Sequence, residues 1–489
     1  MTDLPELRHG LRHDPMRTIH EDESLQGALC RQLLKLPARE SDAATIADEV
    51  ADTLAKQLPD GAFGETTEDT AGALNRLFEL GQSADAPEVQ RGLDALLTQH
   101  RTGATPEAPE GDNLTSPIGA HARAGFLSRD TIDALVLGGR HAAPETPAAL
   151  RHMADHPETW LSATGCPWTA NFFMQTLWRA RHVEAVEDTV LVGLRWFERH
   201  MDAAGLVGYM DPWGHVKTAG IIAHPLGARQ ARRMMPLVLR TQKGDGGWGE
   251  NTVAVVRMLT AHGLLDELRD LPPFPSDWTT ERSIPAPAGD FRHMTYADGM
   301  LWAHDVKANE VVAVSPGDGS VTRRIPLPVD KVFGIAWHDG LLAACQGGPW
   351  ESNRNLLLID PDTGSVSREI SLDKVDMAVG LCALGGRLWI GDGFAFGAKL
   401  IDPARPDAIT HVQWPGTCAG YMAATDDTVW HTDSFAGVMI ECDRVGELTD
   451  WAEIRFGGSV DGLAWDGDAL WALDSDARRI RAIERVAAD

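Results

Sequence analysis

The chain has 489 residues, which is enough for two or three domains and too many for one small core. Its 71 Asp and Glu residues outnumber 44 Lys and Arg residues, and the formal net charge of −27 disfavours a nucleic-acid or anionic-membrane partner. With 43% hydrophobic and 24% charged residues, the composition is typical of a globular protein and not of a disordered one.

The N-terminal residues and the cysteines together indicate a cytoplasmic protein. Residues 1–15 (MTDLPELRHGLRHDP) lack the apolar core and small-residue cleavage site of a secretory signal. No run of about 18 apolar residues occurs that could span a bilayer. The six cysteines include no CxxC pair, which argues against a zinc ribbon or a disulfide scaffold. We therefore expect reduced thiols in a cytosol.

After an N-terminal extension (1–21), residues 22–270 read as an all-helical domain. Apolar residues recur at helical spacing, as in Leu25, Leu29 and Leu33, and Gly, Pro and Asp separate roughly ten to twelve such segments. Two segments are similar to each other: Gln57–Gly81 and Gln242–Gly263 both contain Gln, Asp-Gly, an aromatic residue, Gly and Glu before an apolar helix. This similarity predicts a stacked array of helical hairpins.

The D-G-x-[FW]-G element before a capped helix resembles the repeats of the α/α-toroid superfamily, which includes protein prenyltransferase β subunits and terpenoid cyclases. Residues 165–177 (GCPWTANFFMQTL) resemble a third repeat. The resemblance implies a closed helical ring around a cavity for an apolar or isoprenoid-like substrate. The catalytic motifs of the family are absent from this sequence. No D-x-D-D motif occurs, and Thr164 occupies the position of the Asp in a zinc-binding Asp-x-Cys pair.

In a toroid, residues just before the inner helices converge on the cavity. The segment GYMDPWGHVKT (208–218) places Asp211 and His215 close together, and this pair is our candidate for proton transfer. Cys166 is a candidate nucleophile or metal ligand, or a small buried residue. The other catalytic candidates are Glu250 and Asp69, although Asp69 can equally be a helix cap. The substrate-binding candidates are Trp168, Trp213, Asn171 and His121, and the alternative for the two Trp residues is a place in the core.

A Pro-rich linker (271–278, LPPFPSDW) separates this domain from residues 279–489, where short alternating strands repeat about every 40 to 45 residues. Four strands per period predict a β-propeller, and five periods predict five blades. Residues 279–287 can complete the last blade and so remove the free sheet edges. The strand pattern resembles lactonase-like and glutamine-cyclotransferase-like propellers. Equivalent Trp residues should pack between blades: Trp302, Trp389, Trp430 and Trp471.

The second strands of the blades end in equivalent positions, four of which are Asp. They are Asp305, Cys345, Asp392, Asp433 and Asp474. Because equivalent positions surround one central channel, Asp392, Asp433 and the nearby His431 are candidate ligands of a divalent metal. The alternative is that each Asp caps a turn by accepting backbone N–H groups. The long loop 345–355 adds Trp350 as a candidate substrate-binding residue.

The expected fold is therefore an α/α toroid followed by a five-bladed propeller. The leading functional hypothesis is a cytosolic, bacterial-type lyase, isomerase or cyclase that acts on an apolar small molecule in the toroid cavity. One alternative is a carbohydrate- or lactone-processing enzyme with its site in the propeller channel. The other is a non-enzymatic binding scaffold. A small-molecule partner and, as cofactor, a divalent metal fit the two enzyme hypotheses; the oligomeric state stays open.

Overall fold

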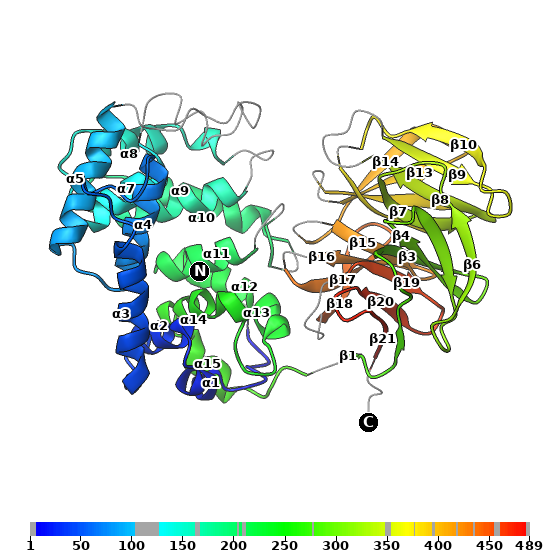
Figure 1. Cartoon of the computed structure of the whole chain (residues 1–489), viewed down its shortest axis with the longest axis horizontal. Helices are drawn as coiled ribbons and strands as arrows, with labels where there is room; N and C mark the ends of the chain where they lie inside the picture. Colours follow the sequence, from blue (N-terminus) through cyan, green and yellow to red (C-terminus); the bar gives the residue numbers. More distant parts are fainter. Residues whose placement is uncertain are drawn as a thin grey trace. The chain divides into compact units, whose positions relative to one another are not determined.

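Figure 1 shows the structure, a computed structural model, as a helical part followed by a β-sheet part. The described residues are 6–102, 127–161, 167–202, 205–207, 212–275, 278–347, 354–375, 377–393, 397–416, 419–433, 436–453 and 460–485. The chain divides into two compact units. The helical unit comprises Met1–His200, Trp213–Met235 and Gln242–Pro273. The propeller unit comprises Phe274–Asp489 with two short segments, Met201–Pro212 and Pro236–Thr241.

Fourteen α-helices lie in the described residues before Pro273. They are α1 (Pro15–Glu21), α2 (Leu25–Leu33), α3 (Glu40–Leu54), α4 (Thr67–Glu79), α5 (Pro87–Thr102), α7 (Arg129–Leu137), α8 (Glu145–Asp155), α9 (Pro167–Ala180), α10 (Glu187–His200), α11 (Pro212–Ile221), α12 (Pro225–Arg233), α13 (Met235–Thr241), α14 (Thr252–Ala261) and α15 (Leu264–Asp270). Short 3-10 turns precede two of the later segments, η1 (Pro157–Thr159) and η2 (Gly249–Asn251).

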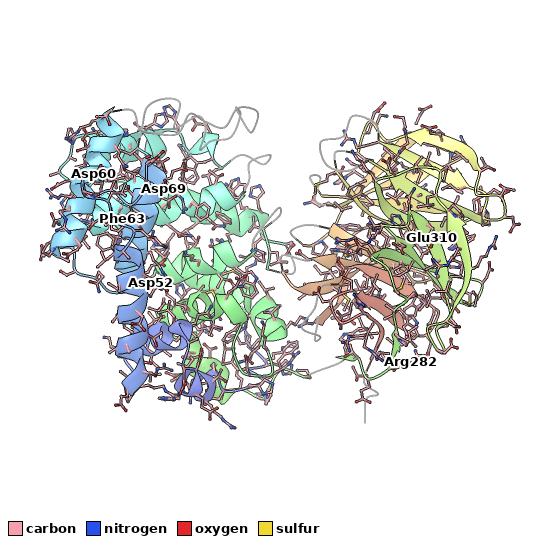
Figure 2. All side chains as sticks on the ribbon, in the orientation of Figure 1. Asp52, Asp60, Phe63, Asp69, Arg282 and Glu310 are labelled. Atoms are coloured by element: carbon pink, nitrogen blue, oxygen red, sulfur yellow. The ribbon has the colours of Figure 1, made fainter. Side chains whose placement is uncertain are left out.

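The two similar sequence segments form the same turn before α4 and before α14. The Gln57 amide donates to the carbonyl of Gly61 (3.0 Å), as the Gln242 amide does to that of Gly246 (2.9 Å). The N–H of Phe63 donates to the Thr70 hydroxyl (3.1 Å), and the N–H of Trp248 donates to that of Thr252 (2.8 Å). Figure 2 shows Asp60, Phe63 and Asp69 gathered at the start of α4. The repeat is therefore structural, because the shared Gln and Thr residues make equivalent bonds in both turns.

Within the helical unit, many helices pack in sequence order, and α14 near the end of the unit also contacts α2 near its start. α4 packs on α5 and α7, α7 on α9, and α9 on α10. The Gln175 amide of α9 donates to the Thr218 hydroxyl of α11 (2.8 Å). His262, at the C-terminal end of α14, bonds the Ala219 carbonyl of α11 (2.8 Å). α14 also packs on α2, so chain segments more than 200 residues apart lie side by side.

The propeller unit consists of five sheets, as the repeat spacing predicts. Four blades are consecutive four-stranded sheets. Blade 1 contains β3 (Phe291–Ala297), β4 (Met300–Asp305), β5 (Glu310–Val314) and β6 (Val321–Pro326). Blade 2 contains β7 (Val332–His338), β8 (Leu341–Gln346), β9 (Asn355–Ile359) and β10 (Val366–Ser371). Blade 3 contains β11 (Ala378–Leu384), β12 (Arg387–Asp392), β13 (Gly397–Asp402) and β14 (Arg405–Gln413). Blade 4 contains β15 (Ala419–Ala424), β16 (Thr428–Asp433), β17 (Val438–Asp443) and β18 (Leu448–Glu453).

Blade 5 joins the two ends of the propeller unit. It contains β19 (Gly462–Trp465), β20 (Leu470–Asp474) and β21 (Arg479–Arg485) from the end of the chain. Two short strands from the start of the unit, β1 (Trp278–Thr279) and β2 (Ser283–Pro285), pair with β21. The inner strands also contact one another in a closed circle, from β3 through β7, β11, β15 and β19 back to β3. The predicted closure is confirmed. Strands from the start of the unit pair with β21, so that edge of blade 5 is covered.

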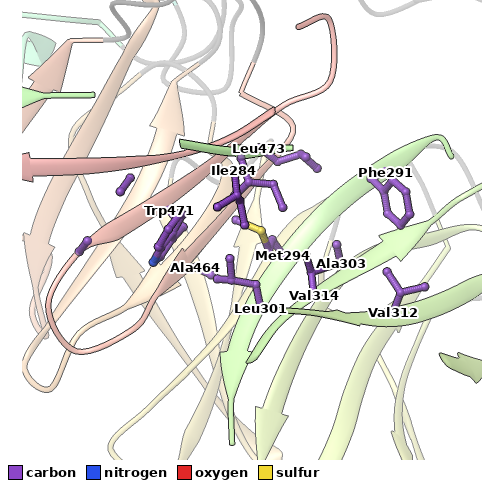
Figure 3. Packing of buried hydrophobic residues seen from close by; sticks show 13 residues of the cluster. Ile284, Phe291, Met294, Leu301, Ala303, Val312, Val314, Ala464, Trp471 and Leu473 are labelled. Carbon is purple, nitrogen blue, oxygen red and sulfur yellow. The ribbon is translucent and has the colours of Figure 1, made fainter. Parts of the chain in front are cut away.

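Apolar side chains fill the spaces between blades. All four predicted Trp residues are buried. Figure 3 shows Trp471 of blade 5 in one cluster with Leu301 and Met294 of blade 1, and Ile284 of β2 completes it. Trp302 packs against blade 2, and Trp430 packs against blade 5. Elsewhere, none of the described helices is both long and apolar enough to cross a membrane.

Candidate functional site

The five inner strands of the propeller share one position where the backbones of neighbouring blades approach closely. Three blades have glycine there: Gly334, Gly380 and Gly462. A Cβ atom on these residues would lie 2.8 Å from Leu381 N, 2.2 Å from Gly420 O and 3.0 Å from Met294 N, respectively. Only glycine fits such an approach without displacement. In blades 1 and 4 the equivalent residues are His293 and Tyr421, so two bulky polar side chains occupy the centre.

His293 is held at this position by an irregularity of its strand. The register between β3 and β4 shifts between Arg292 and Met294, and His293 has a φ of 51°. Few non-glycine residues adopt this left-handed conformation. The bulge itself belongs to the fold, because β7, β11 and β15 show register shifts at the equivalent place. The His293 N–H donates to the carbonyl of Asp461 on the neighbouring blade (2.7 Å), which anchors the bulge.

Four further groups surround His293, and we call all five residues the central cluster: Arg292, His293, His304, Tyr421 and Asp461. The rings of His293 and Tyr421 lie 5.0 Å apart, and those of His293 and His304 stack at 6.2 Å. The Arg292 guanidinium and the Asp461 carboxylate both act electrostatically on the Tyr421 phenol. Asp461 also accepts the hydroxyl of Ser475. Residues from blades 1, 4 and 5 therefore form one continuous polar network.

Burial sets the protonation state of these groups. It raises the pKa of Tyr421, the Asp461 carboxylate raises it further, and the Arg292 cation opposes both. Burial lowers the pKa of His293 to about 3, and the charges of His304 and Arg292 act in the same direction. Burial likewise lowers the pKa of His304 to about 4, against the attraction of Asp305. At pH 7 the central cluster thus holds a protonated phenol and two neutral imidazoles.

Arg292 is the accessible member of the cluster. Its side chain is 51% exposed, and the carboxylate of Asp290 lies 3.8 Å from its Nε. Asp461 is only 7% exposed. An accessible guanidinium binds a carboxylate or phosphate through parallel N–H bonds, and a protonated phenol beside it can donate a proton to the bound molecule. The arrangement is suited to binding and proton transfer on an anionic small molecule.

The three predicted metal ligands, Asp392, Asp433 and His431, each make other contacts in the structure. Among the described residues, no group of three or more His, Cys, Asp or Glu side chains is placed to hold a metal ion. The Asp392 carboxylate instead accepts the N–H of Met377 (3.1 Å), and the Asp433 carboxylate accepts that of Ala436 (2.9 Å). His431 is fully buried and stacks on Trp414 at 4.5 Å. The turn-capping alternative accounts for Asp433, whereas Asp392 accepts an N–H from the residue just before the first strand of its blade.

The same capping role applies to the equivalent residues of the other blades. Asp305 accepts the N–H groups of Lys307 (3.1 Å) and Ala308 (3.0 Å), and Asp474 accepts that of Ala477 (2.9 Å). Each carboxylate therefore closes the turn that follows the second strand of its blade.

In the helical unit, two predicted site residues come together in a buried polar group. The Nδ1 atom of His215 lies 3.1 Å from the side-chain oxygen of Asn171, which also accepts the Thr218 hydroxyl (2.9 Å). His215 stacks on Phe197 at 4.4 Å and is 4% exposed. Burial lowers its pKa to about 3, although Gln230 faces the ring and acts in the opposite direction. His215 is therefore neutral at pH 7 and packed as a core residue.

The remaining candidates of the helical unit are separated or lie outside the described residues. Asp69 is exposed and caps α4, where its N–H donates to the Thr66 hydroxyl (3.1 Å). Glu250 is exposed in the turn η2, and Trp213 is partly buried in the first turn of α11. Trp168 lies in α9, but its side chain is outside the description. Also outside the described residues are Cys166, Asp211, His121 and Trp350.

Comparison with known proteins finds similar structures but no related sequence. No family model matches the chain, and no curated protein matches it either. A glutaminyl cyclase of Myxococcus xanthus is 13% identical, with 44% of this chain and all of the other covered, at a TM-score of 0.37. The PQQ-bound aldose sugar dehydrogenase of Streptomyces coelicolor is 12% identical over 44% of this chain and all of the other, at 0.33. A virginiamycin B lyase of Staphylococcus aureus is 16% identical over 41% and 68%, at 0.29.

The similarity is one of fold. At these identities and TM-scores it says nothing about the reaction or the substrate of this chain.

One further sequence feature, outside the motifs described above, indicates the central cluster. When the five inner strands are aligned on Met294, Ile335, Leu381, Met422 and Leu463, the preceding residue is glycine in three blades and His or Tyr in two. Tyr421 is one of only three tyrosines in the chain. At the axis of the propeller, the two blades that lack the repeated glycine therefore indicate the site better than the repeated Asp does.

Proposed function

We propose that this chain is an enzyme of small-molecule metabolism whose reaction centre is the central cluster of the propeller. The observation that carries the proposal is the replacement of glycine by His293 and Tyr421 at the axis, in contact with Arg292 and Asp461. Close packing at the axis favours glycine, so a side chain there needs another reason to be present. The proposal therefore places the active site in the propeller unit and not in the helical unit.

The proposed substrate carries a carboxylate or another oxyanion, which Arg292 binds. Tyr421 donates its proton to the substrate, and the adjacent guanidinium stabilises the resulting phenolate. The Asp461 carboxylate, which acts electrostatically on the same phenol, is the acceptor for a proton that leaves the substrate. Loss of one proton and gain of another is the chemistry of a lyase or an isomerase. The net charge of −27 further supports a small molecule, and not a nucleic acid or a membrane, as partner.

Binding of anionic small molecules to the full-length protein tests this proposal. Lactate, N-acetylglycine and gluconate are titrated against the wild type, and the melting temperature is recorded. We expect at least one of them to raise it, because a ligand that binds only the folded state stabilises that state. Arg292→Gln and Tyr421→Phe should each weaken binding about 10-fold or more, since a charge-assisted hydrogen bond contributes roughly 1.5–3 kcal/mol.

Two matched substitutions control for general effects. Arg368 is an exposed arginine on β10, and Tyr296 lies on β3 with its ring against the apolar core. Arg368→Gln and Tyr296→Phe should leave binding unchanged. Equal weakening by the central and the control substitutions, or no binding of any of the three acids, would remove the support for a reaction centre at the axis.

We also propose that the inner helices α2, α4, α7, α9, α11 and α14 form the closed ring of an α/α toroid. Support comes from the packing of α14 on α2 and from the bonds that join α9 to α11 and α11 to α14. A reaction centre at Cys166, Asp211 and His215 inside this ring stays a prediction. The burial and low pKa of His215 make it a poor general acid at pH 7.

A further inference from the structure

His304 of the central cluster has two buried ring nitrogens without hydrogen-bond partners. The residue is 1% exposed, and among the described residues no atom forms a hydrogen bond with its Nδ1 or its Nε2. Two neighbouring side chains have other partners. The Asp305 carboxylate accepts two backbone N–H groups of the following turn, and the Asn309 amide donates to the Leu327 carbonyl (3.2 Å). A neutral imidazole offers one donor and one acceptor, and leaving them buried and unpaired is destabilising.

The other blades do not have such an unpaired group at this position. The strand pairing aligns His304 with these residues of blades 2 to 5: Cys345, Gly391, Thr432 and Leu473. In blade 2 it makes Gln346, and not Cys345, the counterpart of Asp305. Three of the four side chains contain no nitrogen or oxygen, and the Thr432 hydroxyl accepts the N–H of Tyr421 (2.9 Å). The fold therefore does not require an imidazole here.

His304 lies beside the residue that is proposed to bind the oxyanion. Arg292 on β3 is its cross-strand partner on β4, and such partners have their Cβ atoms about 4.5–5.5 Å apart on one face of the sheet. The ring of His304 also stacks on that of His293, with 6.2 Å between centroids and 20° between planes. His304 therefore adjoins both the exposed guanidinium and the side chains at the axis.

We infer that His304 is a specificity-determining residue that binds a hydroxyl group of the substrate, and that the substrate is a hydroxy acid with this hydroxyl close to its carboxylate. The inference rests on the function proposed for the central cluster. A hydroxyl both donates and accepts, so it can pair with the imidazole whichever nitrogen carries the proton. The carboxylate binds to Arg292, and the cross-strand pairing places the hydroxyl near it. A site of this kind rejects the analogue without the hydroxyl, because its buried nitrogens then stay unpaired.

The test compares acids that differ only in the hydroxyl: lactate with propionate, and 3-hydroxybutyrate with butyrate. Their binding to the full-length protein is measured by calorimetry at pH 7. In at least one pair the hydroxy acid should bind about 10-fold or more tightly than its partner. His304→Phe keeps a ring without nitrogens and should abolish this preference while leaving the affinity for the plain acid unchanged. His304→Gln should keep part of the preference, because an amide also donates and accepts.

Two further variants separate recognition of the hydroxyl from recognition of the carboxylate. His338 is a buried histidine at the end of β7, with its Nε2 3.5 Å from the Asp339 carboxylate, and His338→Phe should keep the preference. Arg292→Gln should weaken both members of a pair alike, because both carry the carboxylate. Without ligand, His304→Phe should melt at or above the wild-type temperature, since no hydrogen bond is lost.

Two results would overturn the inference and leave the proposed function standing. In the first, both members of each pair bind equally, with an affinity that depends on Arg292 and not on His304, as expected if a water molecule pairs with the imidazole. In the second, N-acetylglycine binds through Arg292 and neither hydroxy acid binds. If none of these acids binds, or if Arg292→Gln has no effect on any of them, the proposed function fails together with the inference.

Discussion

Four buried histidines show how strongly position alone determines the chemistry of a side chain. Burial is the first cause that lowers the pKa of His215 and His293 to about 3 and that of His304 and His431 to about 4. All four rings are neutral at pH 7 in the folded protein. In the unfolded chain the same residues titrate near 6.5.

The folded protein should therefore lose stability in acid. The unfolded chain takes up protons at these histidines as the pH falls below about 6.5, whereas the folded chain does so only near 3 to 4. The stabilisation is complete above about pH 6.5 and is lost as the pH falls toward 4, at up to about 1.4 kcal/mol per pH unit for each histidine. Urea unfolding at pH 7, 6 and 5 measures this slope.

His215→Asn isolates one of the four contributions. The substitution should reduce the slope between pH 6 and pH 5 by roughly 1 kcal/mol per pH unit, since one proton fewer is bound on unfolding. It should also lower stability at pH 7, because the stacking on Phe197 is lost. Parallel curves for wild type and His215→Asn would contradict the assignment of a neutral, buried ring.

At the scale of single elements, the repeated Asp at the end of the second strand stabilises a turn. Asp305 is buried and accepts two backbone N–H groups. Asp305→Ala leaves these donors without a partner and should lower the free energy of unfolding by about 1–3 kcal/mol. Asp305→Asn keeps an acceptor and should cost less. Urea unfolding of the two variants checks this, and an Ala variant as stable as wild type would show that the carboxylate has another role.

The elements themselves could be predicted from the sequence far better than the site. Blade period, closure by residues 279–287 and burial of the Trp residues all follow from strand alternation and turn residues, which are local signals. The repeated turn before α4 and α14 was visible for the same reason. The sequence does not show whether Asp392 bonds a backbone N–H or binds a metal, because a carboxylate can do either. The direction in which its side chain points depends on the fold. Tyr421 and Asp461 lie on different blades, so their contact has no local sequence signal.

At the scale of the whole molecule, closure is shown for the propeller unit and proposed for the helical unit. In the propeller unit β1 and β2 close the circle through β21. In the helical unit α2 packs on α14, although one lies near the start and the other near the end of that unit. A closed ring has no terminal repeat, whereas the ends of an open array fray first.

Hydrogen exchange can therefore distinguish a closed helical ring from an open array. In a closed ring the amides of α2 and α14 should exchange about as slowly as those of α7, which lies between α4 and α9. Exchange in α2 and α14 that is 100-fold or more faster than in α7 would indicate free ends, and the toroid proposal would then be abandoned.

The most direct test of the account is a crystal structure of the full-length protein with the anionic small molecule that raises its melting temperature. We expect density for the ligand at the axis of the propeller, with its oxyanion on Arg292 and a hydrogen bond from the phenol of Tyr421. Full occupancy of another site with no density at Arg292 and Tyr421, at a ligand concentration well above the Kd, would contradict the central claim.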